Sequence, residues 1–243
     1  MIHANAEGLP LYRQISQLIE SDIESGRYAV GAQLPTEHDL GRHYKVNRHT
    51  AREALRQLKD DGLAYSIRGK GTFVAHSKVL YRVARKMRFS TSVLEVGLTP
   101  GAKLISTRTE PANETLRDKL DLPKDAPLVV LEILRSVNQI PFSFAVSYLP
   151  AEHFGLMSQR LQEGFSLYAL MRELYGIEVS RQSSIFEVTL PETRDAELLQ
   201  IPLNVPLLTT RSLAVDQTLQ PVEYCVSHMR GDMGSIMVDF SEK

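Results

Sequence analysis

Three arginines at four-residue intervals give this sequence its clearest candidate for chemistry, which is binding to phosphates and base edges. Arg48, Arg52 and Arg56 fall on one face of a helix that contains them. The opposite face is apolar and carries Ala51, Ala54, Leu55 and Leu58. Such a helix can pack through one side and present its arginines to a groove of DNA. A solvated charged face is the alternative.

A second basic element follows this helix. Leu63, Tyr65 and Ile67 alternate with other residues, and a further apolar stretch covers 72–74. The intervening tip is basic and glycine-rich, and consists of Arg68, Gly69, Lys70 and Gly71. The pattern predicts a hairpin whose tip can reach a phosphate backbone. An ordinary tight turn is the alternative.

Local signals show how these groups are positioned. Thr36, with Asp39 three residues later, predicts the N-cap of a second helix. Asn47 predicts the N-cap of the arginine-bearing third helix. Three helices followed by a basic-tipped hairpin predict a winged helix-turn-helix. Its recognition helix would enter the major groove, and its wing would reach the backbone or the minor groove.

Charge and length divide the chain of 243 residues. Residues 1–88 hold 15 Lys and Arg against 9 Asp and Glu, whereas residues 89–243 hold 13 against 20. The first part is therefore the candidate for nucleic-acid contact. We expect a DNA-binding domain over 1–76, a basic linker over 77–88 and a second domain over 89–243.

Cysteine usage and hydropathy indicate the compartment. Cys225 is the single cysteine, so no internal disulfide forms and a reducing environment fits. No apolar run approaches the roughly 20 residues of a membrane span, and the first ten residues lack the charged and apolar regions of a signal peptide. We therefore expect a cytoplasmic protein without membrane association.

The second half contains an internal repeat. One copy runs as a helix over 89–97, a strand over 102–110, a helix over 113–120 and a hairpin that continues past Pro141. The other copy repeats this order over 165–176, 179–190, 192–199 and past Pro221. Two such units predict a pseudo-symmetric α+β domain with hairpins in its sheet.

The repeat places possible anion-binding groups at equivalent positions. Ser90 and Ser166 each begin a predicted helix, where free N–H groups and the helix dipole favour an anion. Arg135 lies late in a strand of the first copy, and its counterpart in the second copy is near Ala214. A guanidinium there could clamp a phosphate-like group. Ordinary N-caps and a surface ion pair are the alternative.

Motifs for catalysis or metal binding are missing from the sequence. There is no HExxH, no CxxC and no serine in a nucleophile-elbow context. His38, His43 and His49 lack metal-ligand spacing on a helix. We therefore expect neither a metal, a cofactor nor an enzymatic activity. A lyase-like enzyme and a ligand-binding module without DNA binding stay open as alternatives.

The first 76 residues resemble a known family. Leu34 to Glu37, the run VNRHTAREAL from Val46, and the run RGKGTFV from Arg68 are similar to the N-terminal domain of GntR-type bacterial transcription regulators. The resemblance implies that Arg48 and Arg52 contact bases or phosphates. It also implies that Lys45 takes the place of a common turn glycine, and that His38 replaces an arginine that reads a guanine. The expected DNA-binding residues are Thr36, His38, Asn47, Arg48, Thr50, Arg52, Arg68, Gly69 and Lys70.

Residues 80–240 resemble the effector domain of the HutC subfamily, which is similar in fold to chorismate lyase. The resemblance rests on FSTS from Phe89, GLTPG from Gly97, the run from Ser166 to Tyr168, and PVEY from Pro221. It implies an effector site made of Ser90, Thr91, Arg135, Ser166, Tyr168 and Glu223. Relatives that sense sugar phosphates hold the sugar through residues whose positions here are Ile133, Ala145 and Met229.

The blocks RFS, RSVN and the run from Pro221 to Met233 resemble PhnF-type regulators of phosphonate utilisation. The expected protein is a ligand-controlled transcription regulator, most simply a repressor, that binds an inverted-repeat operator as a homodimer. Its expected effector is a small anion, namely a phosphonate, a phosphate ester or a sulfonate. A sugar phosphate is the alternative effector.

Overall fold

The computed structural model describes residues 9–75, 79–83, 89–161 and 163–238. The chain divides into two compact units. The first unit contains the N-terminal helices and one hairpin, and the second is built from residues 79–199 and 203–238. Each unit is described by itself below. Among the described residues, none of the helices is long and apolar enough to cross a membrane.

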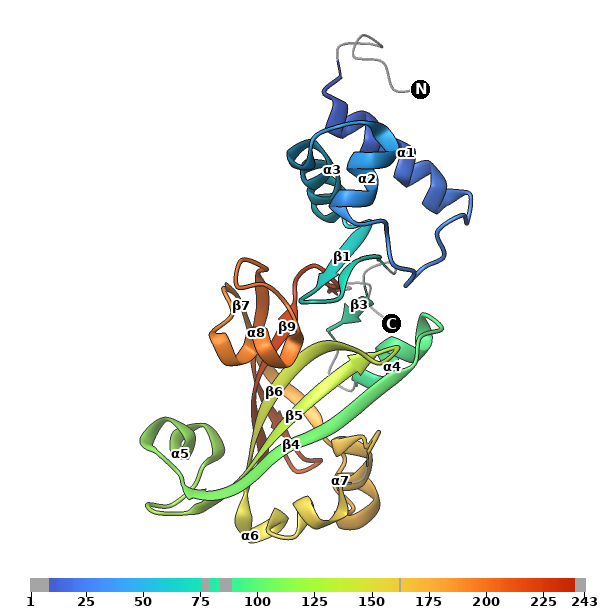
Figure 1. The fold of residues 1–243 in the computed structure, drawn as a ribbon. Helices are drawn as coiled ribbons and strands as arrows, with labels where there is room; N and C mark the ends of the chain where they lie inside the picture. The colour runs from blue at the N-terminus through green and yellow to red at the C-terminus, as the bar shows by residue number, and fades with distance from the viewer. Residues whose placement is uncertain (1–8, 76–78, 84–88, 162, 239–243) are drawn as a thin grey trace. The chain divides into compact units, whose positions relative to one another are not determined.

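The first unit is a winged helix-turn-helix, as predicted. Helices α1 (Leu11–Glu24), α2 (Glu37–Tyr44) and α3 (Arg48–Asp60) precede the hairpin of β1 (Ala64–Ile67) and β2 (Gly71–Val74) (Figure 1). The apolar face predicted for α3 is buried with residues of the other elements. This core contains Ile15, Ile19, Leu34, Leu40, Ala51, Ala54, Leu55, Leu58, Ala64 and Val74.

Caps fix the turn between α2 and α3. Thr36 and Asp39 form the predicted capping box, in which the Thr36 hydroxyl oxygen accepts from the Asp39 N–H at 3.2 Å. The Asn47 Oδ1 accepts from the Thr50 N–H at 2.8 Å and begins α3. Lys45 ends α2 in the left-handed conformation, with φ 55° and ψ 42°, where a glycine is usually found. The turn therefore forms despite the missing glycine.

The second unit contains a six-stranded antiparallel sheet in the order β4-β5-β6-β9-β8-β7. The first copy of the predicted repeat consists of α4 (Phe89–Glu95), β4 (Pro100–Pro111), α5 (Glu114–Leu120), β5 (Pro127–Val137) and β6 (Ile140–Pro150). The second consists of α7 (Leu167–Tyr175), β7 (Ser180–Thr189), α8 (Thr193–Leu199), β8 (Leu207–Val215) and β9 (Pro221–Arg230). Both copies have the same element order, and β6 pairs with β9 at the centre of the sheet. The predicted repeat is confirmed.

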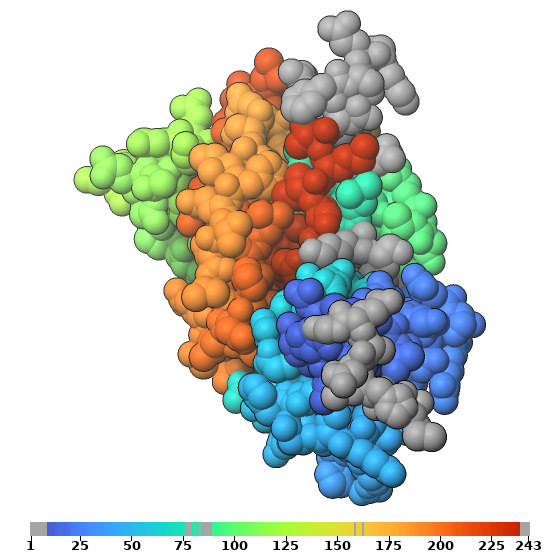
Figure 2. All heavy atoms as spheres, turned by 90° about the horizontal axis from the view of Figure 1, so that it is seen from above, coloured from blue at the N-terminus to red at the C-terminus, as the bar shows by residue number. Residues whose placement is uncertain are grey.

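The two faces of this sheet bury different clusters. α7 packs on one face through Leu167 and Met171, together with Phe154 of α6 (Ala151–Phe154) and Met157 of a 3-10 helix (Met157–Arg160). α5 packs on the opposite face through Leu116 and Leu120. It lies at the end of the β4–β5 ribbon, light green in Figures 1 and 2. The first face is therefore lined by core residues from both copies of the repeat.

Part of the predicted linker belongs to the second unit. Residues 79–82 form β3 (Val79–Arg82), which pairs in parallel with β10 (Gly234–Met237). No sequence pattern indicates this pairing, because more than 150 residues separate the two strands. Residues 77–78 and 84–88 of that linker lie outside the described residues.

Candidate functional site: a nucleic-acid interface and an anion pocket

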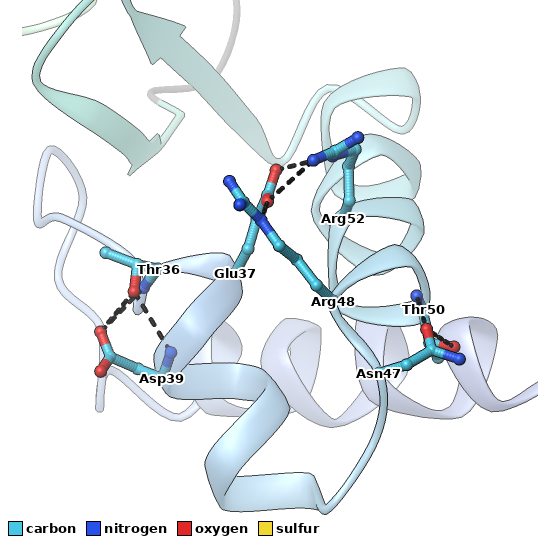
Figure 3. A network of polar contacts seen from close by, with 7 residues as sticks. All are labelled: Thr36, Glu37, Asp39, Asn47, Arg48, Thr50 and Arg52. Carbon is cyan, nitrogen blue, oxygen red and sulfur yellow. Dashed lines mark hydrogen bonds and ion pairs between the residues drawn. The ribbon is translucent and has the colours of Figure 1, made fainter.

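The arginines of α3 are held by a carboxylate of α2. Oε2 of Glu37 accepts from the Arg48 Nε at 2.6 Å, and its Oε1 accepts from the Arg52 Nε at 2.9 Å. Figure 3 shows Glu37 between the two guanidinium groups. The side chains of Arg48 and Arg52 are still 75% and 55% exposed. Glu37 thus fixes both arginines near their Nε atoms and leaves guanidinium surface free for a groove of DNA.

The same contacts keep Glu37 ionised. Hydrogen bonds and charge from Arg52 and Arg48 lower the pKa of Glu37 from 4.5 to about 2, against a smaller opposing effect of burial. The third arginine of the stripe, Arg56, bonds instead to Glu53 at 2.7 Å and Asp60 at 3.1 Å. The stripe therefore splits into an anchored pair and an arginine engaged within its own helix.

The other predicted DNA-binding residues lie around this pair. The Thr36 and Asn47 side chains serve as caps, and the Thr50 hydroxyl donates to Asn47 Oδ1 at 3.0 Å. His38 is exposed, and its Nε2 lies 2.8 Å from an Arg42 nitrogen. Each cap engages one backbone N–H group, and the remaining free N–H groups of the first turn, with the helix dipole, suit contact with a phosphate.

The wing carries the remaining predicted residues. Arg68, Gly69 and Lys70 form its exposed tip, and Gly69 has a φ of 75° with open space around its α-carbon. Gln33 donates from Nε2 to the Lys70 carbonyl oxygen at 2.8 Å and so fixes the turn. A left-handed glycine at the tip lets the backbone approach a nucleic acid closely.

The second unit contains a cavity of about 130 Å³ on the sheet face that carries α7. Five of the six predicted effector residues line it, namely Ser90, Arg135, Ser166, Tyr168 and Glu223. Thr91 is exposed on α4 and is not among the lining residues. Residues far apart in the sequence therefore meet at one cavity, as an effector site requires.

Arg135, Ser90 and Ser166 bring a guanidinium and two hydroxyl groups to the lining of this cavity. The Arg135 guanidinium lies over the Phe89 ring, 5.7 Å from its centroid. Ser166 precedes α7 without capping it through its side chain, so its hydroxyl is not engaged by that helix. A guanidinium beside two hydroxyl groups can hold an oxyanion.

A carboxylate on the cavity wall is already engaged. Oε1 of Glu223 accepts from the Ser147 hydroxyl at 2.6 Å, and its Oε2 accepts from the Tyr168 hydroxyl at 2.5 Å. Burial and the Glu223 charge raise the pKa of Tyr168 well above 10, so its hydroxyl keeps the proton that it donates. In this structure the Tyr168 hydroxyl is therefore engaged in its hydrogen bond to Glu223.

Arg181 of β7 also lines the cavity, although the sequence patterns did not identify it as a site residue. It lies opposite Ala214 of β8, whereas Arg135 of β5 lies opposite Ala102 of β4. Within the repeat, Arg181 therefore takes the place of Ala102. An alignment of the two copies pairs Arg181 with Ala102, but only the register of β7 against β8 places Arg181 beside the cavity.

The positions at which the resemblance to sugar-phosphate sensors implies sugar contacts are apolar and buried here. Ile133, Ala145 and Met229 are exposed by 1%, 0% and 6%, and Ile133 and Met229 line the cavity. Within the described ranges, no group of three or more His, Cys, Asp or Glu side chains could hold a metal ion. Hydroxyl groups, two arginines and one engaged carboxylate supply the polar chemistry of the cavity.

Comparison with known proteins finds a family match in each of the two units. Residues 11–74 match the family described as bacterial regulatory proteins, gntR family, and residues 95–234 match the UTRA domain. The probable transcriptional regulator PhnF of Escherichia coli is 30% identical over 223 residues, which cover 91% of this chain and 92% of PhnF. The transcriptional repressor NagR of Bacillus subtilis is 27% identical over 224 residues, 92% of each chain.

A solved structure has the same fold. The crystal structure of PhnF from Mycobacterium smegmatis matches with a TM-score of 0.67 and 24% identity, over 96% of this chain and 100% of that one. These relatives are named as transcription regulators rather than enzymes. The chain therefore belongs to the gntR family of bacterial regulators that carry a UTRA domain, and it is an operator-binding, ligand-responsive transcription regulator.

Proposed function

We propose that this regulator is a homodimeric repressor that leaves an inverted-repeat operator when a small phosphonate, phosphate ester or sulfonate binds its second unit. Two recognition helices are needed to read the two halves of an inverted repeat. A relative named as a repressor supports the sign of regulation, and the similarity to PhnF supports the ligand class.

One observation carries the choice of ligand. Arg135, Ser90 and Ser166 line a cavity whose sugar-reading positions are occupied by apolar side chains. A guanidinium fork and hydroxyl groups match the oxygens of a tetrahedral oxyanion. Ile133 and Met229 offer a sugar hydroxyl no hydrogen-bond partner, and burying a hydroxyl without one is unfavourable. A small anion with a short apolar part fits these walls better than a sugar phosphate does.

The proposed switch is a shift of population. The ligand binds more tightly to an arrangement of the dimer in which the two DNA-binding units no longer match the spacing of the half-sites. Operator and effector then weaken each other's binding by the same factor. The N-terminal residues that contact DNA need not touch the ligand for this coupling to operate.

A thermal-shift screen with small phosphonates, sulfonates and sugar phosphates tests the proposed ligand class. A ligand that binds only the folded protein raises the melting temperature. Arg135→Ala is expected to abolish this rise and to leave operator binding in the absence of ligand intact. Arg172→Ala removes an exposed arginine from α7 and serves as the matched control, with an unchanged response.

Three outcomes would contradict the proposal. Stabilisation by sugar phosphates alone would replace the phosphonate class with a sugar phosphate. Loss of operator binding together with the ligand response in Arg135→Ala would mean that Arg135 is needed for the fold rather than for the ligand. Sedimentation in the presence of operator DNA measures the stoichiometry, and one chain per operator would refute the dimer.

A further inference from the structure

Arg181 carries hydrogen-bond donors that the protein itself does not satisfy. Its Nη2 donates to the Tyr81 hydroxyl at 2.7 Å, and the guanidinium lies over the Tyr81 ring, 5.6 Å from its centroid. Its Nε and Nη1 are buried and have no hydrogen-bond partner among the described residues. Unsatisfied donors on a buried charged group are costly. Since Arg181 lines the cavity, a bound ligand could supply the missing acceptor.

The charges around the cavity do not balance. Arg135, Arg181 and Glu223 are the charged residues among those that line it. Glu223 accepts hydrogen bonds from two hydroxyl groups. Among the ion pairs of the described part of the chain, none includes Arg135 or Arg181. An arginine stays protonated in proteins. Two cations without a carboxylate partner favour a ligand with two negatively charged groups.

The two arginines approach the cavity from opposite sides. Arg135 is on β5 and Arg181 on β7, with β6, β9 and β8 between them. Through the strand registers Arg135 is level with Val188, seven residues from Arg181 along β7, and both arginines line the same cavity. The charges of both arginines act on the thiol of Cys225 in β9. Burial and Glu223 raise the pKa of its thiol to about 11, and both guanidinium groups act in the opposite direction.

The internal repeat supports the same arrangement. Each copy places one arginine and one alanine on paired strands, as Arg135 with Ala102 and as Arg181 with Ala214. The arginine changes strand between the copies, so the cations stand at two separate places in the cavity. A single oxyanion at Arg135 would leave Arg181 unsatisfied.

We infer that the effector carries a second acidic group, which Arg181 binds while Arg135 binds the first. The ligand class is a short phosphono- or phosphocarboxylic acid, with its tetrahedral oxyanion at Arg135, Ser90 and Ser166 and its carboxylate at Arg181. This inference rests on the proposed function and narrows its ligand class. Tyr81 holds the Arg181 guanidinium in place and leaves Nε and Nη1 for the carboxylate.

Calorimetric titration of the full chain with two matched probes tests the inference. 3-Phosphonopropionate and propylphosphonate share the phosphonate and the chain length, and differ in the carboxylate. Wild type is expected to bind 3-phosphonopropionate about tenfold or more tightly, because a hydrogen-bonded charge pair is gained. Arg181→Met is expected to remove this preference and to keep the affinity for propylphosphonate. Arg172→Met is the control, with the preference intact.

The outcomes separate this inference from the proposed function. Equal affinity of wild type for the two probes would overturn the inference alone. If neither probe binds, the phosphonate class and the inference fall together. The melting temperature of unliganded Arg181→Met shows whether Arg181 is structural. We expect this melting temperature not to fall, because the substitution removes a partly buried cation whose Nε and Nη1 have no partner in the residues that the structure describes. A large fall, with both affinities reduced equally, would refute the assignment, and Arg181→Lys should retain part of the preference.

Discussion

Glu37 offers a test of how the DNA-reading arginines are positioned. In the folded chain its pKa is about 2, against an ordinary value of 4.5, because Arg52 and Arg48 hydrogen-bond to it. At about 1.4 kcal/mol per pKa unit, this difference corresponds to at most about 3.5 kcal/mol. Both arginine side chains are more than half exposed, so solvent screening reduces the expected contribution to about 1 kcal/mol. Glu37→Gln should therefore destabilise the chain by about 1 kcal/mol at pH 7.

The contribution of Glu37 to the free energy of unfolding depends on pH. The folded pKa of Glu37 lies below the unfolded one, so the contribution is complete above about pH 5 and is lost as the pH falls toward 2. Urea unfolding at pH 7, 5 and 3 should show the difference between wild type and Glu37→Gln narrowing at pH 3. A difference that is constant over this range would refute the ion-pair account of Glu37.

The same variant should change DNA binding. Removing one negative charge beside Arg48 and Arg52 should strengthen nonspecific binding and steepen its salt dependence. Freeing the two arginines should reduce the ratio of specific to nonspecific affinity, because they are no longer held in place. Glu53→Gln is the matched control. Glu53 pairs with Arg56 within α3, and its side chain is about as exposed as that of Glu37. An equal loss of specificity in both variants would mean that the loss follows from the change in net charge, and not from the positioning of Arg48 and Arg52 by Glu37.

The effects of four further substitutions can be predicted from the same structure. Arg48→Ala and Arg52→Ala should each weaken operator binding roughly 5- to 150-fold in fluorescence anisotropy, and unchanged affinity in both would contradict the placement of α3 in the groove. Lys45→Gly should stabilise the chain by about 1 kcal/mol in urea unfolding, because Lys45 is left-handed; destabilisation would refute this reasoning. Burial raises the pKa of Glu132, but hydrogen bonds from Arg194 and others hold it below its ordinary value. Glu132→Gln should therefore lower the free energy of unfolding by about 2 kcal/mol at pH 7. The loss should become smaller as the pH falls below about 4.5, and an equal loss at pH 3 would contradict this ion-pair role of Glu132.

Features governed by neighbouring residues could be predicted from the sequence. The caps at Thr36 and Asn47 depend on groups three residues away, and both form as expected. The repeat predicted the element order of the second unit because each copy carries the same spacing of helices, strands and prolines. Burial of the apolar side of α3 followed from its periodicity.

Features that depend on how elements meet could not be predicted. Glu37 bonds to arginines 11 and 15 residues away, and this requires the angle between α2 and α3. Arg181 needs the register of β7 against β8 to place it beside the cavity. β3 and β10 pair across most of the chain, and neither strand has a local signal that names its partner. The engagement of the Tyr168 hydroxyl by Glu223 is of the same kind.

The most direct test of the regulator is an operator titration with and without ligand. An operator selected from random duplexes is labelled, bound to the full chain and titrated with the phosphonate that most raises the melting temperature. We predict that the ligand releases the operator from wild type, and that Arg135→Ala stays bound at every ligand concentration. A ligand that stabilises the wild-type protein and leaves its operator affinity unchanged would contradict the account.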